Sequence, residues 1–118
     1  MAKVEYQPGG LIVGDFPVAI RYVTIASGQE LARGAVIGRI SASDKYIASL
    51  AAAEDGSEDP GAILAESVDA SGGDVVAPAF FAGEFAADKL TIGTGHTAAA
   101  VEAAFRVAGL PIFVRTRV

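Results

Sequence analysis

The sequence has no cysteine and a single histidine, His96, among its 118 residues. The absence of cysteine excludes disulfides, thiolate catalysis and cysteine-ligated metal sites. No serine lies in a Gly-x-Ser-x-Gly elbow, so a nucleophile–base pair with His96 has no support. We therefore assign no catalytic residue, no cofactor-binding residue and no metal ligand, and we expect a protein that is not an enzyme and needs no cofactor.

Basic clusters and long apolar runs are also missing. The net charge is −5, and the largest basic grouping is Arg115-Thr116-Arg117, so the sequence lacks the concentrated positive footprint of a nucleic-acid-binding protein. No stretch approaches the roughly 20 apolar residues of a membrane-spanning helix. Residues 1–10 lack the apolar segment of a signal peptide. We expect a soluble protein made in the cytoplasm, with neither nucleic acid nor membrane as a partner.

Apolar residues are abundant instead. They make up 52% of the chain, against 19% charged residues, and the length corresponds to one domain. A small domain buries only part of its surface, so this composition leaves apolar area exposed. Association into an oligomer is an economical way to cover it.

Most of the predicted elements are strands. In residues 16–25, Val18, Ile20 and Tyr22 alternate with Ala19, Arg21 and Val23, which is the period of a strand. Residues 45–53 are ambiguous, because alanine favours a helix whereas Tyr46-Ile47 favours a strand. The remaining predicted strands are residues 35–40, 62–68, 75–84, 90–92 and 112–118, with turns at 69–74 and 86–89.

The sequence predicts one helix, at residues 97–108. Thr97 can cap its first turn, and Val101, Phe105 and Ala108 form an apolar stripe at helical spacing. Gly109 stands where a left-handed residue often ends a helix, and a proline follows two residues later. A glycine pattern in residues 28–38 is typical of small barrels, in which glycine permits bends.

Two short motifs have the appearance of binding sites. Residues 93–96, Gly-Thr-Gly-His, precede the helix but lack the lysine of a phosphate loop, so we interpret them as a turn that leads into the helix. The acidic residues of the segment 54–60 do not follow the ligand spacing of a calcium loop, and the glycine required at its sixth position is a proline. We interpret that segment as a solvated surface loop.

The order of elements from Gly34 onward resembles the head decoration proteins of tailed phages, of the lambda head protein D type. The matching features are the loop 55–59 (Asp-Gly-Ser-Glu-Asp), the strand 61–65 (Gly-Ala-Ile-Leu-Ala), and a helix followed by an apolar strand. The resemblance implies a mainly β fold, a small distorted β-barrel or β-clip-like domain with one C-terminal helix and a flexible N-terminal arm. It also favours a strand at residues 45–53.

The same resemblance implies a function. Such proteins bind as homotrimers to the outer surface of the virion capsid, with the major capsid protein as partner, and stabilise the head against internal DNA pressure. We divide the chain into an N-terminal arm, residues 1–15, and a decoration domain, residues 16–118. The glycines and proline at 8–10 separate the arm from the core, and Leu11-Ile12-Val13 is suited to adding a strand to another sheet. The candidate capsid-binding residues are Tyr6, Pro8, Leu11, Ile12 and Val13.

Two alternatives remain open at this point. An internal strand is the alternative reading of residues 11–13. For the whole chain, the alternative is a small non-viral β-domain that serves as an oligomerisation or ligand-binding module. A less favoured version is a lipoyl or biotinyl carrier, in which Lys45 after Asp44 would be the modified residue at a hairpin tip.

Overall fold

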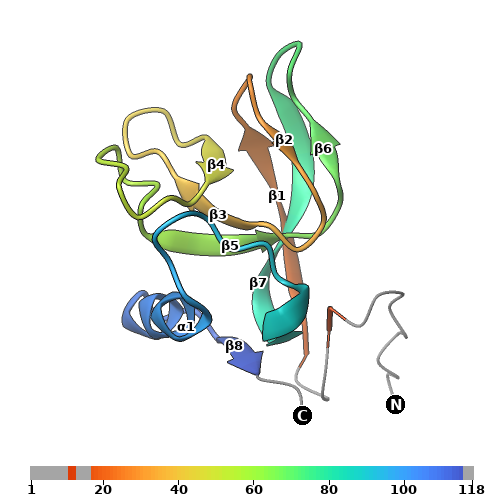
Figure 1. The fold of residues 1–118 in the computed structure, drawn as a ribbon. Coiled ribbons are helices and arrows are strands. Elements are labelled where there is room, and N and C mark those ends of the chain that lie inside the picture. Colours follow the sequence, from red (N-terminus) through yellow and green to blue (C-terminus); the bar gives the residue numbers. More distant parts are fainter. Residues whose placement is uncertain (1–10, 13–16, 116–118) are drawn as a thin grey trace.

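The computed structural model describes residues 11–12 and 17–115. Their β-strands form a barrel with a helix packed against it (Figure 1). The elements follow one another as β1 (Ala19–Ile25), β2 (Glu30–Leu31), β3 (Val36–Arg39), β4 (Tyr46–Ala48), β5 (Pro60–Leu64), β6 (Val68–Asp69), β7 (Val75–Ala86), the 3-10 helix η1 (Ala87–Lys89), α1 (Ala98–Val107) and β8 (Ile112–Arg115). The predicted mainly β fold with one C-terminal helix is confirmed.

Five strands close the barrel. The sheet order is β1-β4-β3-β5-β7-β8, and β1 also pairs with β7, which joins the two ends of the five-stranded part. β8 continues the sheet parallel to β7, outside the closed ring. The short strands β2 and β6 pair with each other in a separate two-stranded ribbon beside the barrel (Figure 1).

The pairing of β1 with β7 is the longest in the molecule's described part. It runs antiparallel from Ala19 opposite Ala82 to Ile25 opposite Val75, with an irregularity after Ala19. β1 meets β4 only at Ile25, which is opposite Tyr46. The barrel wall is therefore continuous on one side of β1 and is held by a single residue pair on the other.

Two apolar clusters lie on opposite faces of the central strands. In β5, Ala62 and Leu64 belong to the cluster inside the barrel, whereas Ile63 points to the cluster shared with the helix. Each residue of that trio is fully buried. A strand buried on both faces has no polar alternation, which explains why this segment reads as a continuous apolar run.

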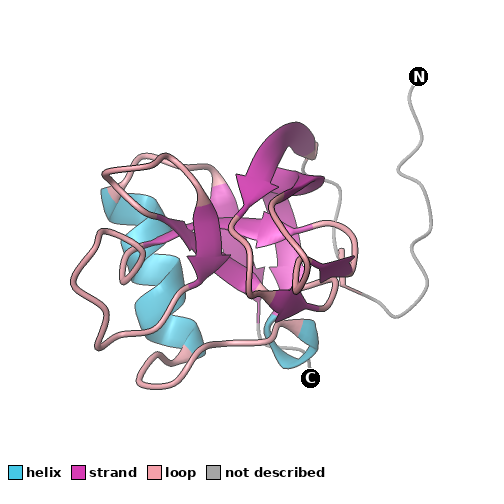
Figure 2. Ribbon diagram, turned by 90° about the horizontal axis from the view of Figure 1, so that it is seen from above, coloured by secondary structure: helices cyan, strands magenta, loops and turns pink. Residues whose placement is uncertain are grey.

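The helix begins and ends as the sequence predicts. The Thr97 side chain accepts a hydrogen bond from the Ala100 N–H, 3.1 Å away, and Gly109 has a φ of 77°, in the left-handed region. Val101 and Phe105 are buried in the second cluster, where the helix covers one side of the strands (Figure 2).

Three sequence predictions need correction. Residues 90–92 do not form a strand, because Thr91 makes only an isolated bridge to Ala35. The predicted strand 62–68 ends at Leu64, and Val68 belongs to a separate strand, β6, which pairs with β2. Residues 45–53 contain a strand of only three residues. Apolar side chains pack equally well from irregular backbone, so their spacing alone does not show where ladder hydrogen bonds stop.

Candidate functional site

The outer face of β1 and β7 carries apolar side chains that no described residue covers. Ile20 is 50% exposed, Tyr22 72% and Val76 64%, and the register places all three on the same side of the two strands. Val18, just before β1, is 40% exposed. We call this group of four residues the outer face. Contiguous exposed apolar patches often mark interaction sites, whereas single exposed apolar residues are normal on a monomer.

A groove of about 290 Å³ lies beside the outer face. Its apolar lining includes Ile12, Ile20 and Phe80. The Arg33 guanidinium lies 5.6 Å from the Phe80 ring centre and donates a 2.7 Å hydrogen bond to the Ala65 carbonyl oxygen. The groove thus has an apolar floor and one charged residue of each sign, Arg33 and Glu66, in its lining, which suits protein contact better than catalysis.

The gap between β1 and β4 forms a second groove, of about 360 Å³. Arg21 lies over the Phe81 ring at 5.3 Å, and Phe81 meets Tyr46 edge to face at 6.4 Å between ring centres. Burial raises the pKa of the Tyr46 hydroxyl, and Asp44 adds to the rise, whereas nearby arginines oppose it. We call this region the barrel gap.

The candidate capsid-binding residues are only partly within the described structure. Leu11 is buried, at 4% exposed, and its carbonyl oxygen accepts a 2.8 Å hydrogen bond from the Ala86 N–H. Ile12 bridges Phe85 and lines the groove beside the outer face. Tyr6, Pro8 and Val13 lie outside the described residues. Leu11 therefore contributes to the core, while Ile12 borders the exposed apolar surface.

His96 contacts two other segments of the chain through its imidazole ring. Its Nε2 lies 3.0 Å from the Glu58 carbonyl oxygen and 3.3 Å from the Ser49 hydroxyl. The Ser49 hydroxyl also donates to the Glu58 carbonyl oxygen, at 3.2 Å. The three groups join the turn before α1, the end of β4 and the acidic loop. No carboxylate hydrogen bond to His96 occurs among the described residues.

The acidic loop is more ordered than the solvated loop expected from the sequence. Its carboxylates are largely at the surface, but Ser57 is fully buried and the Asp55 carbonyl oxygen accepts a 2.8 Å hydrogen bond from the Ser41 N–H. The Ser57 hydroxyl and N–H both donate to the Asp55 carboxylate and lower its pKa. The backbone of this loop packs against Gly38. The charged side chains of the loop are thus at the surface, as expected, but its backbone is packed against the barrel.

The remaining candidate groups can be placed only within the described residues. No group of three or more metal-ligating side chains occurs in the described part of the chain. Lys45 forms a 2.7 Å ion pair with Asp74 of another turn, which is unlike a carrier lysine displayed alone at a hairpin tip. Within residues 11–12 and 17–115, no helix has the length and apolar character needed to cross a bilayer.

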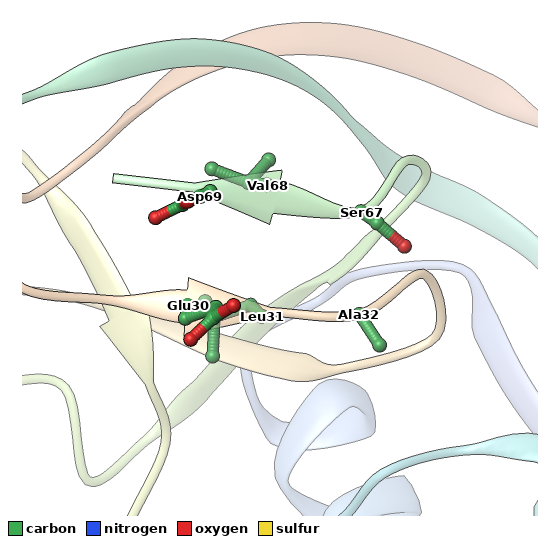
Figure 3. A pocket seen from close by; sticks show the side chains of 6 residues that line it. All are labelled: Glu30, Leu31, Ala32, Ser67, Val68 and Asp69. Carbon is green, nitrogen blue, oxygen red and sulfur yellow. The ribbon is translucent and has the colours of Figure 1, made fainter. Parts of the chain in front are cut away.

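A shallow groove of about 410 Å³ runs along the β2–β6 ribbon (Figure 3). Glu30 and Asp69 stand opposite each other in the register, so two carboxylates face the same small surface. Ser71 donates to Asp69 through its hydroxyl and its N–H, which lowers the pKa of that carboxyl. The hydrogen bonds of the turn therefore account for the placement of Asp69.

Sequence reasoning did not select the outer face as a site. The alternation of Val18, Ile20 and Tyr22 shows that they share one face, but the same alternation is typical of strands whose apolar face lies in a core. The missing signal is on the opposite face, where Ala77 and Ala79 of β7 fill the barrel interior. Because these small alanines point into the barrel, the large apolar side chains of Ile20 and Tyr22 lie on its outside.

A comparison with protein families agrees with this architecture. The sequence model of the family described as bacteriophage lambda head decoration protein D matches residues 10–110. The match begins upstream of the resemblance noted from Gly34 onward, and it includes both β1 and α1. No curated protein sequence matched the chain. Because the match covers most of the sequence, the chain belongs to the phage lambda head decoration protein D family.

Proposed function

We propose that this protein binds as trimers to the outer surface of a tailed-phage head and stabilises the shell against the pressure of packaged DNA. Family membership supports a role in capsid decoration and a location on the virion. The major capsid protein is the proposed partner, and the chain has no catalytic role in this proposal. We further propose that the protein is made in the host cytoplasm before it joins the head.

The main support for the proposed trimer is the exposed outer face. Its four apolar side chains are between 40% and 72% exposed on a chain that has no disulfide to stabilise it. Covering them with a second copy removes apolar area from water at about 25 cal/mol per Å². A trimer also makes three attachments to the shell at once, so its avidity greatly exceeds the affinity of one attachment.

The trimer is tested by placing a charge on the outer face. Ile20→Glu buries a carboxylate in the proposed contact and should convert the trimer to monomers in sedimentation or light scattering. Ala99→Glu is the matched control, because Ala99 is exposed near the start of α1, where a negative charge is favourable. A wild-type protein that forms a stable dimer or tetramer, or an Ile20→Glu protein that stays trimeric, contradicts the proposal.

The N-terminal arm remains the proposed capsid attachment, and its test must keep Leu11 in place. Deleting residues 2–10 should leave the melting temperature nearly unchanged and weaken binding to purified heads. Deleting residues 2–14 removes the buried Leu11 as well, which should cost about 2–5 kcal/mol of stability. Unchanged head binding after the shorter deletion would place attachment in the folded domain.

A further inference from the structure

The free edge of β1 has the properties of a site that accepts a strand from another protein. Among the described residues, the second edge of β1 pairs only at Ile25, so the six residues before Ile25 have a described sheet neighbour on the β7 side alone. Unpaired strand edges bind extended segments readily, because backbone N–H and C=O groups stand ready to form a ladder.

The backbone directions along this edge follow from one hydrogen bond. The Ala26 N–H donates to the Tyr46 carbonyl oxygen at 3.0 Å, so it points toward β4. Alternate residues of a strand direct their backbone groups to the same edge. Ile20 and Tyr22 therefore direct their N–H and C=O groups into the barrel gap, whereas Arg21 and Val23 direct theirs toward β7.

On the β4 side of the gap, backbone groups are already bonded or turn away from β1. The Ala48 N–H donates to the Gln29 side-chain oxygen at 3.1 Å, and the chain before Tyr46 turns away through the loop that contains Asp44. The groove of about 360 Å³ between them is lined by the Tyr22 and Thr24 region of β1 and by Phe81. The open groove therefore leaves this edge of β1 accessible to an added strand.

Charge indicates what that strand carries. Arg21 forms no ion pair with any described residue, and it lies over Phe81 in the gap. Asp44, the carboxylate of the same groove, is paired with Arg39 at 3.2 Å. Because Arg39 already offsets the charge of Asp44, Arg21 is the charged side chain of this groove without an ion pair among the described residues, and an acidic side chain beside it would balance its charge.

A second copy of the chain is a poor occupant. The outer edge of β8 already uses one of its donors within the chain, since the Val114 N–H donates to the Glu102 carboxylate at 3.1 Å. Antiparallel pairing of β1 with β1 of another copy, centred on Arg21, would generate a two-fold contact that brings the two Arg21 side chains together, and like charges across a strand pair are destabilising. A strand from a different protein, with a carboxylate beside Arg21, avoids this repulsion.

We propose that the free edge of β1 accepts an extended segment of the capsid shell protein that carries an acidic residue beside Arg21. This inference rests on the proposed function, because it names the part of the partner that the domain binds. The added strand extends the sheet of β7 and β1, so its other side chains continue the outer face beside Ile20 and Tyr22. Apolar residues flanking the acidic one would suit that position.

Hydrogen exchange on the wild-type protein gives the direct test. The probe is purified phage heads that lack the decoration protein. On binding, the amides of Ile20 and Tyr22 should become at least about tenfold more protected, while those of Arg21 and Val23, which face β7, are protected in both states. Heads that bind the chain without slowing Ile20 and Tyr22 exchange overturn the inference but not the proposed function. Protection already present in the free oligomer assigns the edge to a second copy and also overturns it.

Paired variants separate the backbone from the side chains. Both Tyr22→Pro and Tyr22→Ala remove the tyrosine ring, but only Tyr22→Pro also removes the backbone N–H at the free edge. Tyr22→Pro should therefore bind heads about tenfold more weakly than Tyr22→Ala. Arg21→Glu should weaken binding, and Arg21→Lys should restore most of it. Equal binding by the two Tyr22 variants refutes strand addition. Failure of the wild-type protein to bind heads refutes the proposed function together with this inference.

Discussion

A methyl group added at Gly38 should displace the acidic loop from the barrel. Gly38 lies in β3, and a β-carbon built there overlaps the Ser57 carbonyl oxygen and lies 2.8 Å from the Ser57 carbonyl carbon and 2.9 Å from the Asp59 carbonyl oxygen. All three are backbone atoms, so no side-chain rotation relieves the overlap. The substitution Gly38→Ala therefore forces residues 57–59 away from β3.

The expected cost follows from the size of this overlap. Overpacking a well-packed site typically costs about 1–3 kcal/mol. Replacing glycine by alanine also restricts the unfolded chain, which returns about 0.4–1 kcal/mol. A net loss of about 1–2 kcal/mol is expected. With an unfolding entropy of about 2.1 cal/mol/K per residue, this corresponds to a decrease in melting temperature of roughly 4–8 °C.

Gly72→Ala is the matched control for Gly38→Ala. A β-carbon at Gly72 meets no atom within 4 Å, and the φ of Gly72 is not in the left-handed region. Its melting temperature should stay the same or rise slightly. Calorimetry on the two variants and the wild-type protein checks the prediction. If the Gly38→Ala and Gly72→Ala proteins have the same melting temperature, the acidic loop does not pack against β3 as described.

Three further changes have defined outcomes. His96→Ala removes the Nε2 contact with the Glu58 carbonyl oxygen, while Ser49 still donates to it, so unfolding in urea should show a loss of about 1 kcal/mol and head binding should change only a few-fold. A β-carbon at Gly109 meets no atom within 4 Å, but the valine of Gly109→Val must adopt a φ of 77°, so thermal unfolding should show a loss of about 1–2 kcal/mol. The pKa of Asp74 is lowered from 3.8 by the hydrogen bond from Lys45 and then that from Ser27, so its contribution to stability is present above about pH 4 and is lost as the pH falls through the lowered pKa. Asp74→Asn should therefore show a smaller change in stability than the wild-type protein between pH 5 and pH 2 in urea titrations, and an equal change would contradict this assignment.

Local signals in the sequence were sufficient for the elements whose ends depend on local chemistry. Thr97 and Gly109 mark the ends of α1 because capping and left-handed conformations are decided within a few residues. The alternation in residues 16–25 predicts β1 because it spans several periods. By contrast, β2 and β6 have two residues each, too few to show any period.

Long-range contacts account for the features that the sequence could not reveal. The glycine pattern predicted bends, and Gly28 and Gly34 do have positive φ values. Gly38 has an ordinary φ and is required instead by the close approach of Ser57, which lies nineteen positions away in the chain. A glycine needed for space and a glycine needed for conformation look the same in a sequence.

The candidate surfaces depend on the same kind of long-range arrangement. Period two places Ile20 and Tyr22 together, but only the pairing with β7 and the small residues Ala77 and Ala79 decide that their face is outside the barrel. The free edge depends on β4 being only three residues long and meeting β1 at one pair. A longer β4 would close the gap with its own backbone and leave Arg21 lining a sealed wall. The length of β4 therefore decides whether β1 can accept a strand from a partner.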